Sequence, residues 1–173
     1  MALTLIVTPG GATSNGYVSV ADADTYHAYH PYASVWNDAE ADSKIQAIVW
    51  ATRILDEQIE WQGYRVTQAQ LLRWPRSTVQ DRDGYPVDFA TIPKFLKDAT
   101  AELARHLLSK DRFQTLDDAI AGLRSVSAGS VSVEFDSMDR IPLLPGSVRS
   151  LISGYILGTS QASGGFEVSL LRT

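Results

Sequence analysis

The feature that most constrains the fold is a long amphipathic stretch that runs from about Asn37 to Glu60. Its apolar face is a single stripe of side chains at helical spacing: Ile45, Ile48, Val49, Thr52, Leu55 and Ile59. Because each helical residue adds about 1.5 Å, the stretch predicts a helix roughly 35 Å long. Such a helix is long enough to be the spine of a small domain, so we expect a mainly α-helical fold.

Two further apolar stripes predict the other principal helices of a small three-helix bundle. The first of these helices begins near Thr91 and Pro93, and its stripe consists of Leu96, Ala99, Leu103 and Leu107. The second ends at Gly158, and its stripe consists of Val148, Leu151, Ile152, Tyr155 and Ile156. A shorter helix is expected to begin after Ser19 and to end near His30, before Pro31.

Smaller elements are predicted between these helices. Alternating apolar residues indicate a short strand at residues 3–7 and a β-hairpin over roughly 124–136. Thr67 and Gln70 have the spacing of a capping box, which predicts a short helix that Pro75 closes. Asp83-Gly84 is typical of a tight turn.

The sequence predicts a helical domain with a small β element, residues 1–157, and a flexible C-terminal arm, residues 158–173. The arm joins a Gly/Ser-rich tether to an apolar tip made of Phe166, Val168, Leu170 and Leu171. A tethered apolar tip cannot bury itself cheaply on its own domain. It is either an arm that binds a partner, or a disordered tail or edge strand.

The residues that could carry chemistry are few. There is no cysteine, which excludes disulfides, thiolate metal sites and cysteine nucleophiles, and no phosphate-binding or nucleophile motif is present. His27 and His30 lie one helical turn apart near Asp22, but a metal needs three or four ligands. We therefore expect a protein without catalytic residues, metal or cofactor.

The charge balance argues against broad binding to phosphates. The chain has 15 Lys and Arg residues against 20 Asp and Glu, a net charge of −5. No apolar run approaches the roughly 20 residues of a membrane-spanning helix, and the N-terminus lacks the features of a signal peptide. We expect a protein that stays in the cytoplasm where it is made and has no membrane partner.

One segment is positively charged. Residues 61–82 hold four arginines and one aspartate, a net charge of +3, and aromatic residues are interleaved among them: Arg65, Arg73, Arg76 and Arg82, with Trp61, Tyr64 and Trp74. Interleaved aromatic and arginine residues are typical of proteins that bind single strands. The same residues suit contacts between subunits or a place in the core, which the sequence favours over DNA.

Several motifs, in their order along the chain, resemble those of a family of tailed-phage proteins. They are Asn15-Gly16-Tyr17-Val18-Ser19-Val20-Ala21-Asp22-Ala23, Trp74-Pro75-Arg76, Asp83-Gly84-Tyr85-Pro86-Val87, Ile92-Pro93, Ala99 with Glu102-Leu103-Ala104, and Val133-Glu134-Phe135. The resemblance covers roughly residues 3–157. This family is labelled DnaT-like single-stranded DNA-binding protein, and it is also similar to head–tail connector, or adaptor, proteins.

The resemblance to connectors implies a structural, non-catalytic adaptor in the virion neck, present in the host cytoplasm during assembly. Its partners would be the portal protein, neighbouring copies in a ring of about twelve, and a stopper or tail-completion protein. Genomic DNA would pass through the channel without sequence-specific binding, which suits a net negative chain. The apolar tip of the arm would dock on the portal. The alternative is a single-stranded DNA-binding module that uses the cluster at residues 61–82.

Overall fold

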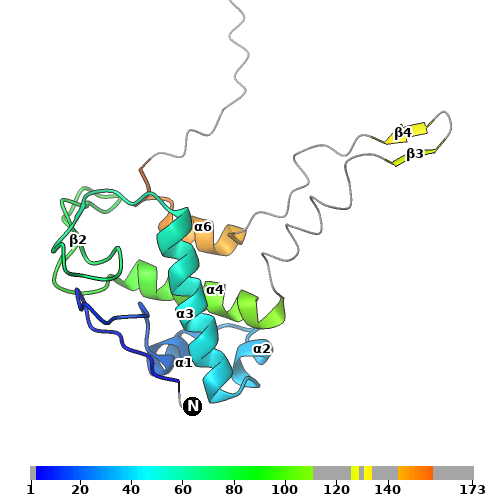
Figure 1. The fold of residues 1–173 in the computed structure, drawn as a ribbon, viewed down its shortest axis with the longest axis horizontal. Helices are drawn as coiled ribbons and strands as arrows, with labels where there is room; N and C mark the ends of the chain where they lie inside the picture. The colour runs from blue at the N-terminus through cyan, green and yellow to red at the C-terminus, as the bar shows by residue number, and fades with distance from the viewer. Residues whose placement is uncertain (1–2, 111–125, 129–130, 134–143, 158–173) are drawn as a thin grey trace, which may run out of the picture.

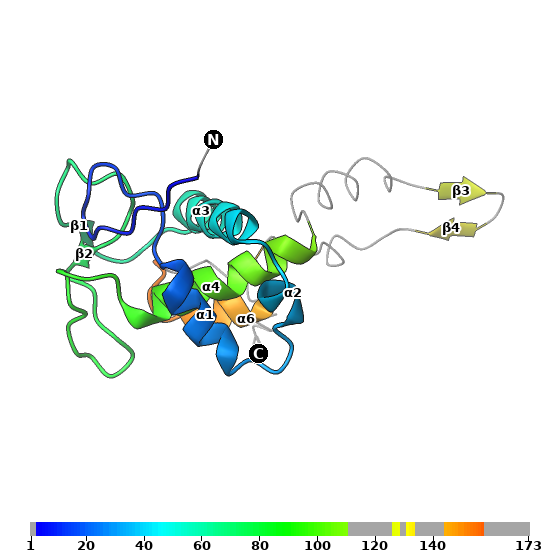
Figure 2. The same cartoon turned by 90° about the horizontal axis from the view of Figure 1, so that it is seen from below.

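The computed structural model describes residues 3–110, 126–128, 131–133 and 144–157. It is mainly helical, which confirms the fold class predicted from the sequence (Figure 1). Helix α4 is central, because all the other described helices contact it: α1 (Val20–Ala28), α2 (Ser34–Asn37), α3 (Ala41–Gln58) and α6 (Gly146–Ile152) around α4 (Lys94–Ser109). Figure 2 shows α3 on one side of α4 and α1 on the other.

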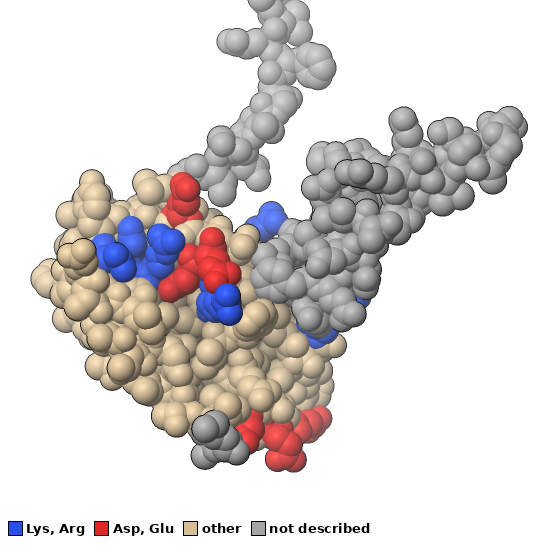
Figure 3. Space-filling model, viewed as in Figure 1, with Lys and Arg blue, Asp and Glu red and all other residues tan. Residues whose placement is uncertain are grey.

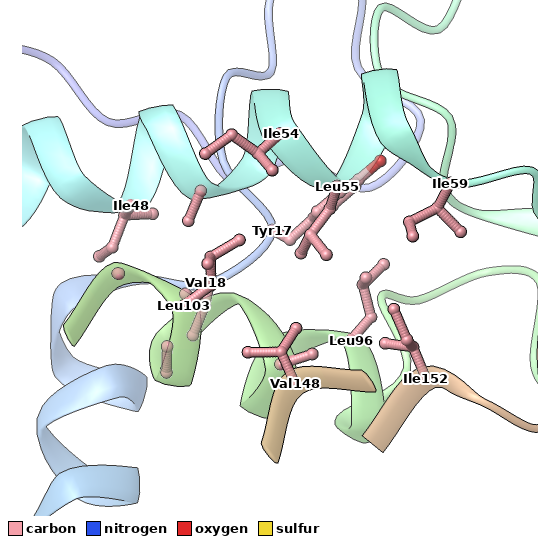
Figure 4. Packing of buried hydrophobic residues seen from close by; sticks show 14 of the residues in the cluster. Tyr17, Val18, Ile48, Ile54, Leu55, Ile59, Leu96, Leu103, Val148 and Ile152 are labelled. Carbon is pink, nitrogen blue, oxygen red and sulfur yellow. The ribbon is translucent and has the colours of Figure 1, made fainter. Parts of the chain in front are cut away.

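The core lies where these helices meet, and it is filled by aliphatic side chains (Figure 4). The stripes predicted from the sequence supply several of them: Ile48 and Leu55 from α3, Leu96 and Leu103 from α4, and Val148 and Ile152 from α6, each fully buried. Tyr17 and Val18 enter the same core from the segment before α1. Burying one such aliphatic side chain contributes about 1.5–3 kcal/mol, so these stripes dominate the stability of the bundle.

The helix predicted from about Asn37 to Glu60 is shorter in the structure, where α3 spans Ala41–Gln58. Helix α2 ends at Asn37 and α3 begins at Ala41. The cause is Trp36, whose side chain is fully buried and whose indole N–H donates to Asp24 Oδ1 at 2.8 Å. Burial of this ring from α2 requires the chain to turn between Asn37 and Ala41, so α3 begins only after the turn.

The last helix is shorter than its stripe predicts. Helix α6 ends at Ile152, and Tyr155 and Ile156 lie beyond it. The ring of Tyr155 stacks on Phe95 with the centroids 3.6 Å apart, while Ile156 pairs with Trp61 in an antiparallel bridge. These tertiary contacts replace the last helical turn.

The predicted β-hairpin is present, as β3 (Val126–Ala128) paired antiparallel with β4 (Val131–Val133). A second short ribbon joins β1 (Tyr64–Arg65) to β2 (Arg76–Ser77). The strand predicted at residues 3–7 is not formed. The backbone of Ile6 instead bonds to Asn15 and Gly16, so this extended segment pairs with a turn rather than with a strand.

The short helix predicted to open at Thr67 is also absent, although its capping box forms. The Gln70 N–H donates to the Thr67 hydroxyl, and the Thr67 N–H donates to the Gln70 side chain. The Gln70 amide also donates to the carbonyls of Leu72 and Pro75. The buried glutamine therefore closes a loop, because its amide binds carbonyl groups further along the chain.

Glu102 connects α4 to its neighbours through a buried carboxylate. Arg105 donates to it at 2.7 Å, His106 Nε2 lies 3.4 Å from it, and His30 Nε2 lies 3.9 Å from it. Burial alone raises the pKa of this carboxyl, but the hydrogen bonds from His106 and Arg105 outweigh burial and hold the pKa well below its usual range. Glu102 is therefore ionised at neutral pH.

His27 is buried between α1, α2 and α4. Its Nε2 lies 3.1 Å from the carbonyl of Ala101, and Nδ1 has no hydrogen-bond partner among the described residues. Burial lowers the pKa of His27, and the bond to Ala101 opposes this shift without reversing it. The imidazole is therefore neutral in the fold, whereas it takes up a proton more readily in the unfolded chain.

We expect His27 to make the fold sensitive to mild acid. As the pH falls from 7 toward 5.5, the unfolded state binds more protons at this position than the folded state does, so the free energy of unfolding decreases. Urea denaturation at several pH values measures this. His27→Gln keeps a donor for Ala101 and does not titrate, so its stability should depend less on pH over this interval; an unchanged dependence would contradict the assignment.

Candidate functional site

Residues 59–93 connect α3 to α4 and contain the positively charged segment found in the sequence. Their only regular elements within the structure described are the two-residue strands β1 and β2, in which Tyr64 lies opposite Ser77 and Arg65 opposite Arg76. With so short a ladder, the order of this segment depends on side chains that bind the backbone.

Arg76 is the main anchor of the segment. Its buried guanidinium donates to the carbonyls of Gln62 at 2.6 Å, Gly63 at 2.5 Å, and Trp61 and Arg73 at 3.3 Å each. Burial lowers the pKa of Arg76, and the neighbouring charge of Arg73 lowers it further. Each of its three guanidinium nitrogens donates to a backbone oxygen, so the role of Arg76 is to hold these loops together.

Trp61 and Trp74 are core residues. Their side chains are 2% and 1% exposed, and their rings meet edge to face with centroids 5.6 Å apart. The Trp74 ring also packs against Phe95 of α4. In this conformation neither indole presents a face on which a base could stack.

A buried polar network fixes the approach to the cis Trp74–Pro75 peptide bond. The Tyr17 hydroxyl donates to Asp56, while the backbone N–H of Trp74 donates to the Tyr17 oxygen. The backbone N–H of Arg73 donates to the same carboxylate at 3.0 Å. Burial raises the pKa of both Tyr17 and Asp56. The network holds the backbone of Arg73 while leaving its side chain in solvent.

Three exposed residues of this segment, Tyr64, Arg65 and Arg73, make up what we call the arginine surface. The Tyr64 side chain is 74% exposed, and the charges of Arg65 and Arg73 are both close enough to act on the pKa of Arg76. Among the described residues, neither arginine forms an ion pair within 4 Å. On the side of the molecule seen in Figure 3, a group of basic side chains lies next to a group of acidic ones.

Arg82 does not belong to the arginine surface. Its guanidinium donates to the carbonyl of Ser150 and to the hydroxyl of Ser153, at the end of α6. The neighbouring turn is the tight turn predicted from the sequence: Asp81 Oδ1 accepts from the N–H groups of Asp83 and Tyr85, and Gly84 has φ of 87°. Sequence reasoning therefore placed four arginines in one cluster, and the structure assigns them three different surroundings.

The sequence analysis did not single out two exposed aromatic residues near the positively charged segment. Tyr85 and Phe89 are both exposed on the loop that leads into α4. The signal available was their position beside the Asp83-Gly84 turn, since bulky residues in a turn-rich stretch have little core to enter.

The apolar tip, Phe166, Val168, Leu170 and Leu171, lies outside the described residues, as does the whole arm 158–173. Within the described ranges no group of three or more His, Asp and Glu side chains could hold a metal ion. In the same part of the chain, no helix is long and apolar enough to cross a membrane.

Comparison with known proteins gives one match. A family described as "Putative DnaT-like ssDNA binding protein" matches residues 1–173, the full length of the sequence. No curated protein and no solved structure matches the chain.

This match corrects the interpretation as a head–tail connector. The matched family is described by single-stranded DNA binding, and that description names no virion, portal or ring. The predicted partners are therefore wrong: the portal protein, neighbouring copies in a ring, a stopper protein and DNA passing through a channel. The predicted location in the virion neck is wrong for the same reason. The net charge of −5 misled because it averages over the whole chain and hides the segment of charge +3.

Replacing Arg76 by alanine should destabilise the fold by about 2–4 kcal/mol, because it leaves several buried carbonyl groups without donors. Arg73→Ala is the matched control, since removing its exposed guanidinium should lower the free energy of unfolding by no more than about 0.5 kcal/mol. Chemical denaturation of both variants measures the difference. Equal losses of stability would mean that Arg76 is not the anchor of this segment.

Proposed function

We propose that this chain, which belongs to the family of DnaT-like single-stranded DNA-binding proteins, binds single-stranded DNA through the arginine surface. The observation that carries the proposal is the family match over all 173 residues. It favours a binding protein without catalytic chemistry.

The electrostatics of residues 61–82 support this assignment. A single strand carries one negative charge per phosphate, and cations placed along a surface bind it by releasing counterions. Arg65 and Arg73 are exposed and have no carboxylate partner within 4 Å among the described residues, so their charge is available to phosphates. Because the chain as a whole is negative, we expect the affinity to be modest and to fall steeply with salt.

Tyr64 supplies the second component of a single-strand site. Bases stack on aromatic rings with little dependence on sequence, and each stack contributes about 1–3 kcal/mol. The Tyr64 ring is exposed, and the pairing of β1 with β2 holds its backbone. Arg76 and Asp56 bind backbone groups of the same segment, at Gln62 and Arg73.

The direct test is fluorescence anisotropy of labelled oligo-dT at several salt concentrations. The wild type should bind, with an affinity that decreases as salt rises. The double variant Arg65→Ala/Arg73→Ala should bind more weakly, and the slope of log affinity against log salt should drop by about 1.4, since each phosphate contact on a single strand contributes about 0.7.

Arg149→Ala is the control, because Arg149 is an exposed arginine on α6 rather than on the arginine surface. It should leave both affinity and slope close to those of the wild type. Absence of oligo-dT binding by the wild type, or binding that does not respond to salt, would overturn the proposal.

A further inference from the structure

A groove of about 610 Å³ lies between α1 and the first turns of α4. One wall is formed by Tyr26, Tyr29 and His30, and the other carries Lys94 and Lys97. Its volume is within the range of about 300–1,000 Å³ that is usual for sites that bind small molecules. No residue of the arginine surface lines this groove.

The aromatic wall comes from an unusual segment, Tyr26-His27-Ala28-Tyr29-His30-Pro31-Tyr32. His27 is turned into the core, whereas Tyr29 is 89% exposed and lines the groove. No other described ring packs against Tyr29, so its face is open to a flat ligand. A base that covered this ring would remove apolar surface of both partners from water.

The rim of the groove carries two ammonium groups, each paired with a carboxylate that also lines the groove. Lys97 pairs with Asp22 at 3.3 Å, and Lys94 pairs with Asp98 at 2.5 Å. Lys94 is largely in solvent, and exposed pairs of this kind contribute little, about 0–1 kcal/mol. A phosphate can therefore compete for these ammonium groups, and the groove then offers aromatic rings on one wall and phosphate partners on the other.

We infer that this groove receives one nucleobase of a bound single strand, with Tyr29 stacking on the base and Lys94 and Lys97 contacting its phosphates. The inference rests on the proposed function and deepens it, because it adds a base-dependent contact to the charge-dependent arginine surface. Bases in a single strand are free to turn into such a groove, whereas those of a duplex are held in the stack.

The experiment compares two strands of about 12 nucleotides, labelled oligo-dT and an equal-length strand whose central sugars lack bases. Tyr29→Ala should weaken oligo-dT binding by at least about fivefold. The same substitution should leave binding to the abasic strand unchanged, because that strand has no base to stack. Tyr29→Phe keeps the ring and should bind both strands as the wild type does.

Tyr32→Ala is the matched control: Tyr32 is an exposed tyrosine of the same segment that does not line the groove. It should not alter binding to either strand. The inference would be overturned if Tyr29→Ala bound oligo-dT as tightly as the wild type does, or if it lost the same affinity for both strands. In either case a loss in Arg65→Ala/Arg73→Ala would leave the proposed function standing. A wild type that binds neither strand would overturn both.

Discussion

The insertion of the Arg76 guanidinium among four backbone carbonyl groups is the interaction on which the functional end of the molecule depends. Residues 59–93 have almost no ladder of backbone hydrogen bonds, so polar side chains take its place. Gln70 binds the carbonyls of Leu72 and Pro75, and Asp56 binds the N–H of Arg73. A buried donor or acceptor left without a partner is costly, which makes each anchor hard to replace.

These anchors separate two kinds of arginine that look alike in the sequence. The buried guanidinium of Arg76 donates to four backbone carbonyl groups, whereas the side chains of Arg65 and Arg73 are exposed and Arg65 donates to one carbonyl, that of Gln70 at 3.4 Å. The aromatic residues differ in the same way: the indoles of Trp61 and Trp74 are buried in the core, whereas the Tyr64 ring is exposed. The residues that stabilise this segment are therefore different from those that we propose to bind DNA, so that mutations can test the two roles separately.

The arginine surface and the groove beside Tyr29 would contribute differently to one bound strand. Exposed arginines act on phosphates, so their contribution depends on salt and not on the bases. An aromatic groove acts on the base, so its contribution depends on the presence of the base and much less on salt. A chain with a net charge of −5 gains from the second kind of contact, because charge alone gives it little affinity.

Local periodicity and capping account for the helical class, the apolar faces of α3, α4 and α6, the Ser19 cap of α1 and the hairpin of β3 and β4, all of which the sequence predicted. The late start of α3, the early end of α6 and the loop at Thr67 depend on the tertiary structure. Trp36 and Tyr155 contact residues distant in sequence, and Gln70 binds carbonyl groups within its own loop; these contacts outweigh the local preference for a helix. The site divides likewise: composition located the arginine-rich segment, but which arginines and aromatics reach solvent depends on packing against α4 and α6, which periodicity does not encode.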